Sequence, residues 1–439
     1  MKYKVKALSD LIFIASSNTQ GNIRYLDFIP GSAFLGVIAK HYDLFENPFD
    51  VFFSGKVRFK DAHIAINSKP SLKIPLMYYH EKLNKQKIYN YWKLEPADFK
   101  GVQYKQIREG YFNGKNFMNV EFSYTQKSAR EKEKGRSKEG AMFGFRSIVK
   151  GSEFYFEIAI DESIGERDRK LIKELIIGEH YVGKSKKSEY GTVEISECDY
   201  DDTVNSVKKS DKYDFVYFKS RACLFDENGN PTYDVRYLHK NLKPENIVYE
   251  KNQIRNYEYV PYNFKRKEDL QRCVIEKGSV AVLKNVPAEI LEDMKKGVGG
   301  FLSEGFGEVI VNPEFLFDKK IELNEVKLKL NFSSEYENDF IQYLKLKKQN
   351  IIKETKMIKD VKKIVEDKAK WFSNITKSQW GNIRTLAVFD DYDTKIKNYI
   401  SKGINQWLPS QQQIMDEILK KEKEFVKLFA TLMMKKAKK

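Results

Sequence analysis

One glycine-rich unit occurs twice in this chain of 439 residues. The first copy ends in residues 178–195 (GEHYVGKSKKSEYGTVEI) and the second in residues 297–311 (GVGGFLSEGFGEVIV). In each copy a Gly-Ser pair opens a strand pattern, a helical pattern follows, and a glycine ends the helix, where a left-handed cap disfavours residues with a Cβ. The repeated order of strand, helix, glycine loop and strand indicates an internal duplication.

The second glycine loop does not have the pattern of the usual nucleotide-binding loops, because residues 297–300 follow a helix, whereas a dinucleotide fingerprint follows a strand. Residues 178–185 (GEHYVGKS) have the spacing of a phosphate loop, but they too follow a helical pattern where that loop would follow a strand. Such loops still offer backbone N–H groups that can approach a phosphate closely. The first loop adds Lys184, Lys186 and Lys187. The second has Phe306 without neighbouring lysines, so we expect it to make a close backbone or packing contact.

The composition favours a nucleic-acid partner. Lysine and arginine exceed the acidic residues by 78 − 62 = 16, and 14% of the residues are aromatic. Cations neutralise phosphates and rings stack on bases, although a lysine-rich surface can also serve solubility alone. Three distant cysteines, the lack of a signal-peptide core and the lack of a long apolar run predict a cytoplasmic protein without membrane contact. We expect no metal and no cofactor.

The N-terminal region contains two candidate phosphate contacts. Ser32 follows Pro30 and Gly31 and can cap a helix whose free N–H groups favour an anion, although an ordinary cap is the simpler interpretation. Residues 51–65 alternate as a strand with Lys56, Arg58 and Lys60 on one face. This face is either a bed for a phosphate backbone or a solvated sheet surface.

The remaining chain divides into regions of different pattern. Residues 68–150 are weakly patterned and contain the charged run 127–139, which we expect to form a mobile loop or hairpin tip. Residues 201–211 are a candidate linker. Long helical patterns cover residues 335–371 and the stretch from Ser410 to the basic end, while residues 378–384 (SQWGNIR) show no helical period and predict an exposed loop.

These patterns predict an α+β fold with tandem ferredoxin-like (RRM-like) domains and a helical C-terminal domain. The first domain spans residues 1–200 and includes an irregular, thumb-like insertion at about 68–150. The second spans residues 211–330, and the helical domain spans residues 331–439.

Several motifs together resemble those of a known superfamily. Residues 29–36 (IPGSAFLG) and the two glycine loops are similar to the helix start and the glycine-rich loops of the RAMP proteins of CRISPR–Cas effectors. Residues 57–62 (VRFKDA), 225–231 (FDENGNP) and 378–381 (SQWG), with the Gly278-Ser279 strand, are similar to the Csx-type, Cas-five-like subunit of type III-D complexes.

The resemblance implies a non-catalytic subunit of a type III effector that binds the 5′ handle of the guide RNA (crRNA) in antiviral defence. It also implies two kinds of protein partner, the large polymerase-like subunit and the backbone RAMP subunits. Together with the cationic and aromatic patterns, it predicts RNA-side positions at Gly31, Ser32, Lys56, Arg58, Lys60, Arg130, Arg136, Gly183, Lys184, Ser185, Lys186, Lys187, Ser188, Tyr190, Gly299, Gly300, Ser303, Gly305, Phe306, Gly307, Gln379, Trp380 and Arg384.

Two alternatives remain open at this point. The first is a metal-independent endoribonuclease that processes guide RNA with His41 as general acid or base, because relatives in the superfamily often place a histidine on the first helix. The target-cleaving relatives use an aspartate in the loop before the IPGS motif, and here that loop, residues 16–21 (SSNTQG), has no carboxylate, the next one being Asp27 beside the motif. The second alternative is an assembly subunit that acts mainly through its helical C-terminal domain.

Overall fold

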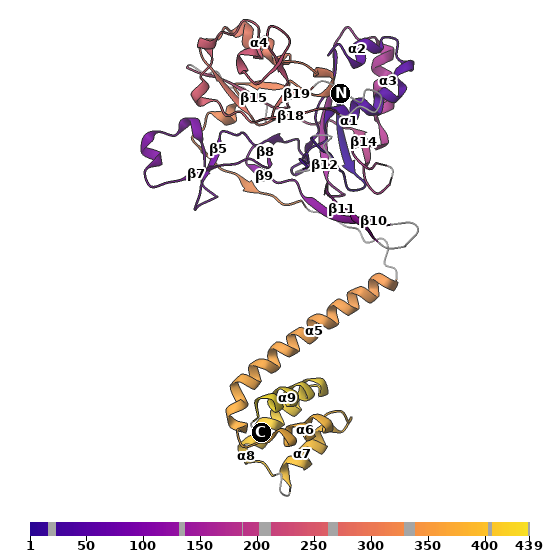
Figure 1. The fold of residues 1–439 in the computed structure, drawn as a ribbon, viewed down its shortest axis with the longest axis vertical. Helices are drawn as coiled ribbons and strands as arrows, with labels where there is room; N and C mark the ends of the chain where they lie inside the picture. Colours follow the sequence, from indigo (N-terminus) through magenta and orange to yellow (C-terminus); the bar gives the residue numbers. More distant parts are fainter. Residues whose placement is uncertain are drawn as a thin grey trace. The chain divides into compact units, whose positions relative to one another are not determined.

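The computed structural model describes residues 1–15, 23–130, 137–186, 188–201, 212–261, 271–328, 339–402 and 406–437. The chain forms two compact units, Met1–Asn331 and Phe332–Lys439, called here the N-terminal unit and the helical unit. The fold is α+β in the first and all-helical in the second (Figure 1). The finer division of residues 1–330 into two domains stays a prediction. No helix in the described ranges has the length and apolar character needed to cross a membrane.

The first sheet of the N-terminal unit is antiparallel throughout, in the order β13-β14-β1-β12-β2, with β3 pairing on β12. Its alternating sequence explains its burial, because Tyr3, Val5 and Ala7 point into the core while the intervening lysines do not. The strands are β1 (Lys2–Ala7), β2 (Val57–Phe59), β3 (His63–Ile64), β12 (Glu153–Ile160), β13 (Gly178–Tyr181) and β14 (Thr192–Glu197).

Helices follow the first and third main strands of this sheet. They are α1 (Gly31–Ile38), α2 (Pro48–Phe52) and α3 (Glu166–Ile176). Helices α1 and α3 lie against each other (Figure 1). The ring of Phe34 on α1 stacks on Phe156 of β12 with 3.8 Å between the centroids, which fixes α1 against the sheet.

A second, smaller sheet has the order β20-β15-β21 and is also antiparallel. It consists of β15 (Asp214–Phe218), β20 (Val280–Leu283) and β21 (Val309–Val311), with α4 (Ala288–Lys295) between the last two. Where the first half has a helix after its first strand, this half has three short 3-10 helices, η4 (Val235–Leu238), η5 (Pro244–Asn246) and η6 (Tyr249–Lys251). Two short hairpins complete this half: β16 (Leu224–Phe225), β17 (Pro231–Thr232), β18 (Asn256–Tyr259) and β19 (Arg272–Ile275).

The insertion predicted to be irregular contains ordered strands. They are β4 (Leu72–Lys73), β5 (Tyr78–Glu81), β6 (Ile88–Asn90), β7 (Tyr104–Gln106), β8 (Tyr111–Asn113) and β9 (Asn116–Met118). They form two small sheets, and each is extended by a strand from the end of the unit, β22 (Lys320–Ile321) or β23 (Asn324–Glu325). Strands β10 (Phe122–Arg130) and β11 (Ser137–Ile148) form a separate hairpin. The sequence missed the small sheets because strands of two to four residues carry too little periodicity.

The helical unit has its own core around Trp380, Trp407 and Phe429. Its helices are α5 (Asp339–Lys368), α6 (Lys377–Leu386), α7 (Tyr392–Ser401), α8 (Pro409–Leu419) and α9 (Lys423–Lys436). The predicted exposed loop at 378–384 is wrong, since this stretch is α6. Thr376 and Gln379 form a capping box at its start, and buried Trp380 and Ile383 lie one helical turn apart.

Candidate nucleic-acid interface

The start of α1 and the first glycine loop lie together, as the sequence predicted for a shared surface. A cavity of about 120 Å³ between them is lined by Ser32, Gly36 and Lys40 on one side and by Gly183 and Lys186 on the other. Gly183 has φ +82°, and a Cβ there would stand 2.5 Å from the carbonyl oxygen of Ile12. The loop therefore needs glycine to pass so close to the chain while presenting the exposed Lys186.

Other residues of the first loop have structural roles. Tyr190 is buried, with its ring 6.0 Å from Phe145, so it is not available for stacking on a base. The Lys184 ammonium lies 5.6 Å from the centre of the Phe145 ring. Ser188 donates a hydrogen bond of 2.9 Å to the carbonyl of Ser185, which closes the loop. Lys187 lies outside the described residues.

Gly31 does not offer its N–H group to an external anion. That N–H donates to Oδ1 of Asp61 at 2.8 Å, and a Cβ on Gly31 would overlap the carbonyl oxygen of Phe59. The positive end of α1 is thus already compensated by a buried carboxylate of the same chain. The predicted phosphate contact at Gly31 is wrong for this reason, while Ser32 remains on the cavity described above.

The second glycine loop packs inside the N-terminal unit. Ser303, Gly305, Phe306 and Gly307 are buried, and a Cβ on Gly305 would stand 2.5 Å from the carbonyl oxygen of Phe59. Phe306 lies under the guanidinium of Arg221, 4.4 Å from ring centre to Cζ. The expected packing contact is therefore present, and burial contradicts the RNA-side positions predicted at Ser303, Gly305, Phe306 and Gly307.

The start of the same loop is held by the strand before β16. Gly300 donates a backbone hydrogen bond of 2.9 Å to the carbonyl of Cys223. Gly299 has φ +71°, and a Cβ there would overlap the same carbonyl oxygen. The loop lies so close to the Cys223 carbonyl that a side chain at Gly299 would not fit, and Gly300 holds the loop there through its backbone N–H.

The cationic face of β2 is neutralised within the chain. Lys56 pairs with Asp50 at 2.7 Å, and Lys60 lies between Glu157 at 2.8 Å and Glu308 at 2.9 Å. Arg58 donates to the carbonyl of Lys296 at the C-terminal end of α4. The predicted phosphate bed is therefore wrong, because each of these cations already has an internal partner.

The remaining predicted positions do not join this surface. Gln379 caps α6, Trp380 is fully buried in the helical core, and Arg384 is exposed on the same helix. Burial excludes Trp380 as a stacking platform. Arg130 ends β10 in the hairpin, and Arg136 lies outside the described residues.

A larger cationic cavity, which the sequence did not predict, opens between the hairpin β10–β11, the segment 23–28 and the β18–β19 hairpin. Its volume is about 380 Å³. The lining contains seven cationic residues and three carboxylates, a difference of 7 − 3 = 4. The cations are Arg24, Lys73, Arg108, Arg146, Arg221, Arg255 and Lys277, and the carboxylates are Asp27, Glu109 and Glu276.

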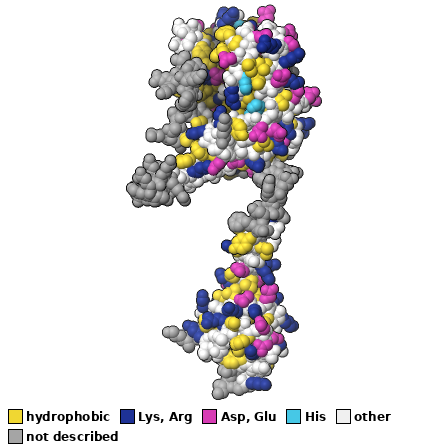
Figure 2. Space-filling model, turned by 90° about the vertical axis from the view of Figure 1, so that its right-hand side faces the viewer, with side chains coloured by type: hydrophobic (Ala, Val, Ile, Leu, Met, Phe, Trp, Pro, Cys, Tyr) yellow, Lys and Arg dark blue, Asp and Glu magenta, His cyan; other side chains and the backbone are white. Residues whose placement is uncertain are grey.

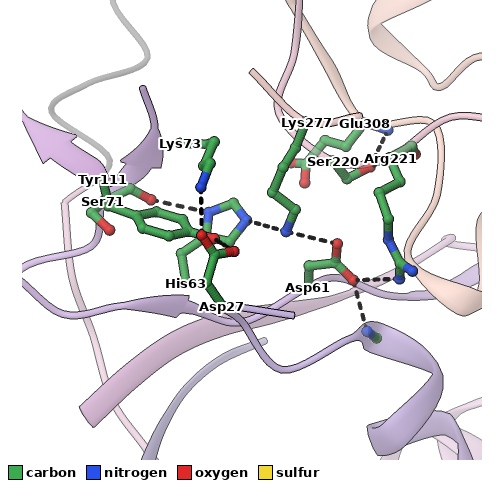
Figure 3. Close-up of polar contacts among 11 residues, drawn as sticks. Asp27, Asp61, His63, Ser71, Lys73, Tyr111, Ser220, Arg221, Lys277 and Glu308 are labelled. Carbon is green, nitrogen blue, oxygen red and sulfur yellow. Dashed lines mark hydrogen bonds and ion pairs between the residues drawn. The ribbon is translucent and has the colours of Figure 1, made fainter. Parts of the chain in front are cut away.

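The buried cations of this cavity belong to an ionic network (Figure 3). The Lys277 ammonium lies 3.0 Å from Oδ2 of Asp61 and 3.0 Å from Nε2 of His63, and the Arg221 guanidinium lies 3.5 Å from Oδ1 of Asp61. Nearby, Asp27 accepts hydrogen bonds from Lys73 and, at 2.9 Å, from Tyr111. These contacts hold the floor of the cavity in place.

Burial sets the protonation of this network. It lowers the pKa of Lys277 to about 8, although Asp61 acts in the opposite direction. Burial and the adjacent Lys277 charge lower the pKa of His63 to about 3. His63 is therefore neutral, with Nδ1–H donating to the carbonyl of Ser71 at 3.1 Å and Nε2 accepting from Lys277. Burial raises the pKa of Asp61, but Lys277 and Arg221 outweigh it and the carboxyl stays ionised.

The arginines at the mouth of the cavity are more exposed than the cations of its floor, and two of them lie against aromatic rings. The Arg24 guanidinium lies 4.4 Å from the centre of the Tyr257 ring, and that of Arg146 lies 3.9 Å from Phe122. Arg24 and Arg255 both face Glu276. Across the described ranges, Arg108 and Arg146 pair with no carboxylate. Such a mouth suits an anion that also carries a flat ring.

His41 lies outside both cavities. It belongs to η1 (Ala39–Leu44), is exposed, and has φ −111° and ψ 28° at a kink in that helix. Within the described chain no carboxylate or hydroxyl hydrogen-bonds to it. The same ranges contain no cluster of three His, Cys, Asp or Glu side chains that could hold a metal ion.

Comparison with known proteins gives only distant structural neighbours. No family model and no curated protein matches the sequence. A chain of the type III-B Cmr-beta complex bound to cognate target RNA and AMPPnP is 11% identical, over 70% of this chain and 96% of that one, with a TM-score of 0.40. A chain of the Csm3–Csm4 subcomplex of a type III-A CRISPR-Cas interference complex is 14% identical, over 71% of this chain and 99% of that one, with a TM-score of 0.34. The CRISPR-associated protein Cas6 is 10% identical, over 71% of this chain and 98% of that one, with a TM-score of 0.25.

Proposed function

We propose that this protein is a non-catalytic RNA-binding subunit of a type III CRISPR effector complex that holds the 5′ handle of the guide RNA. The observation that carries the proposal is the cationic cavity. Four arginines lie at its mouth, two of them (Arg24 and Arg146) beside aromatic rings, above a floor of paired charges that keeps its shape. A single-stranded RNA offers the matching combination of phosphates and base faces.

The order of the strands supports a ferredoxin-like assignment. In the first sheet β14-β1-β12-β2 corresponds to the order 4-1-3-2, with helices after strands one and three. The second sheet has three of the four corresponding strands, and the backbone bridge between Gln253 and Val280 stands on the side where the fourth belongs. Together with the IPGS and glycine-loop motifs, this arrangement motivates the proposed RAMP assignment. The guide RNA, the large polymerase-like subunit and backbone RAMP subunits are the proposed partners.

The proposal is tested by removing cations that have no carboxylate partner in the described chain. Affinity of the full chain for a fluorescent single-stranded RNA with a repeat-derived 5′ handle is measured by anisotropy. We expect Arg108→Ala with Arg146→Ala to weaken binding at least about tenfold, equivalent to about 1.4 kcal/mol. The matched control removes two exposed lysines of the helical unit, Lys420→Ala with Lys421→Ala. Equal binding by both double variants would overturn the proposed site.

The same RNA discriminates between binding and cleavage. Incubation with the protein in a metal chelator, followed by gel analysis, should leave the RNA intact. Specific cleavage that His41→Ala abolishes would replace the proposal by the endoribonuclease alternative.

A further inference from the structure

Helix α5 carries an apolar stripe at seven-residue spacing that continues beyond the bundle it belongs to. Leu344, Ile351, Ile358 and Val365 follow one another at this interval, which keeps them on one face of a helix. Val365 is 3% exposed and lies in the helical core, whereas the other three are 46%, 53% and 40% exposed. The helix is therefore amphipathic along its length, but its own unit covers only the C-terminal part.

Two further apolar side chains flank the exposed part of this stripe. Tyr343 and Ile352 are also exposed on the same segment of α5 and lie on either side of the row. Figure 2 shows apolar side chains at the surface of the helical unit next to lysines and arginines. Single exposed apolar residues need no explanation, but a continuous row of them marks an interaction surface.

A groove extends the stripe toward the bundle. A cavity of about 570 Å³ lies between α5 and α9, and Met357 and Ile358 line it opposite Leu428. Lys353 and Glu422 pair across it at 3.1 Å. From Leu344 to Ile358 the stripe covers 14 residue steps, roughly 21 Å of helix at 1.5 Å per residue, which is enough to receive a helix of about four turns.

The charge around the stripe determines the kind of partner. Residues 342–359 contain six lysines and one glutamate. A second copy of this segment would bring equal positive charge against it, which disfavours self-association. RNA would satisfy the lysines but would leave the aliphatic side chains exposed to water, since it binds through phosphates and ring faces. An acidic helix with its own apolar stripe satisfies both requirements.

We propose that the exposed stripe of α5 docks an acidic amphipathic helix of a partner protein. This surface is separate from the cavity assigned to RNA and does not depend on that assignment. Aliphatic side chains at seven-residue spacing provide the seam, and the lysines beside them select a partner with glutamate or aspartate at the flanking positions.

The proposal is tested with two designed 21-residue helical peptides on the full chain. Both carry leucine at the seam positions, and their flanks are glutamate in one and lysine in the other. Fluorescence anisotropy should show at least tenfold tighter binding of the glutamate peptide. Leu344→Ser with Ile351→Ser should weaken that binding at least tenfold, while the control pair Leu83→Ser with Val388→Ser, at sites elsewhere that are more exposed, should not change it.

Three outcomes would overturn the proposal. The first is no preference for the glutamate peptide, or equal binding by both double variants. The second is a loss of handle-RNA affinity in the stripe variant, which would make the stripe part of an RNA surface. The third is a dimer in sedimentation experiments that the stripe variant abolishes, which would make a second copy the occupant. Circular dichroism confirms that the variants remain folded, as expected for exposed positions.

Discussion

The backbone N–H of Gly31 donates a hydrogen bond to Oδ1 of Asp61 at a distance of 2.8 Å. Asp61 thereby supplies the anion at the start of α1, and the same carboxylate pairs with Lys277 and Arg221 from the second half of the N-terminal unit. One buried side chain thus joins a helix start to two cations on the floor of the proposed RNA cavity.

Removing the Asp61 charge should destabilise the protein strongly. Asp61→Asn leaves Lys277 and Arg221 buried without their anion, a change that typically costs about 3–5 kcal/mol. Urea denaturation of the full chain measures the loss. Asp390→Asn, at a fully exposed ion pair with Lys423, is the control and should change stability by less than about 0.5 kcal/mol. Similar values for both variants would contradict the role given to Asp61.

Gly31→Ala should destabilise the N-terminal unit by roughly 3 kcal/mol, because the new Cβ overlaps the carbonyl oxygen of Phe59. Gly36, one turn and a half further along α1, has open space around its Cβ position. Gly36→Ala should be neutral or stabilise by up to about 1 kcal/mol. Thermal unfolding of the two variants checks the contrast, and an unaffected Gly31→Ala protein would show that the end of β2 can move away from α1.

His63 should make the N-terminal unit sensitive to acid. Its pKa is about 3 in the folded protein and about 6.5 in an unfolded chain, so between these values the unfolded state binds more protons. Stability contributed by the neutral ring is complete above pH 6.5 and falls by up to about 1.4 kcal/mol per pH unit below it. Urea titrations between pH 7 and pH 4 should show a shallower decline for His63→Gln, and an identical decline would refute this assignment.

Handle-RNA affinity should depend on salt. Two phosphate contacts, from Arg108 and Arg146, predict a slope of about −1.4 in a plot of log affinity against log salt, at about −0.7 per contact, because Arg24 and Arg255 already face Glu276. The double variant Arg108→Ala with Arg146→Ala should reduce the magnitude of the slope by about 1.4. Anisotropy titrations across a salt series measure both, and a salt-independent affinity would count against phosphate contacts altogether.

Trp380→Ala should act on stability and leave RNA affinity unchanged. The ring is fully buried against Phe372, Trp407 and Phe429, and its removal should cost about 3–5 kcal/mol in the helical unit. Arg384→Ala on the exposed side of the same helix is the control. Unfolding and RNA titration are measured on the same samples, so a folded Trp380→Ala protein with reduced RNA binding would restore the original prediction.

Periodic segments of the fold could be predicted from the sequence. The helical pattern at 335–371 corresponds to α5. The helix α6 was wrongly predicted as a loop for a physical reason. The polar surface of α6 and Gly381 obscure its short apolar repeat, although the Thr376–Gln379 capping signal was present in the sequence.

The candidate site was only partly predictable. Ser32, Gly183 and Lys186, each predicted as an RNA-side position, line one cavity, and their contact with RNA stays a prediction. The larger cavity could not be predicted, because Arg24, Arg108 and the other cations lie singly on distant segments, and only the fold brings them together. Conversely, Lys56, Arg58 and Lys60 look available in the sequence because the partners that neutralise them are remote along the chain.

The ion pairs between Asp61 and its two cations also limit how the two halves of this chain can be exchanged between related genes. Asp61 lies between β2 and β3 in the first half of the N-terminal unit, whereas Arg221 and Lys277 come from its second half. If both halves descend from one ancestor, they are no longer interchangeable, because a half transplanted from a relative without the matching charge would leave an ion stranded in the interior. Recombination between such genes should therefore preserve the two halves as a single heritable block.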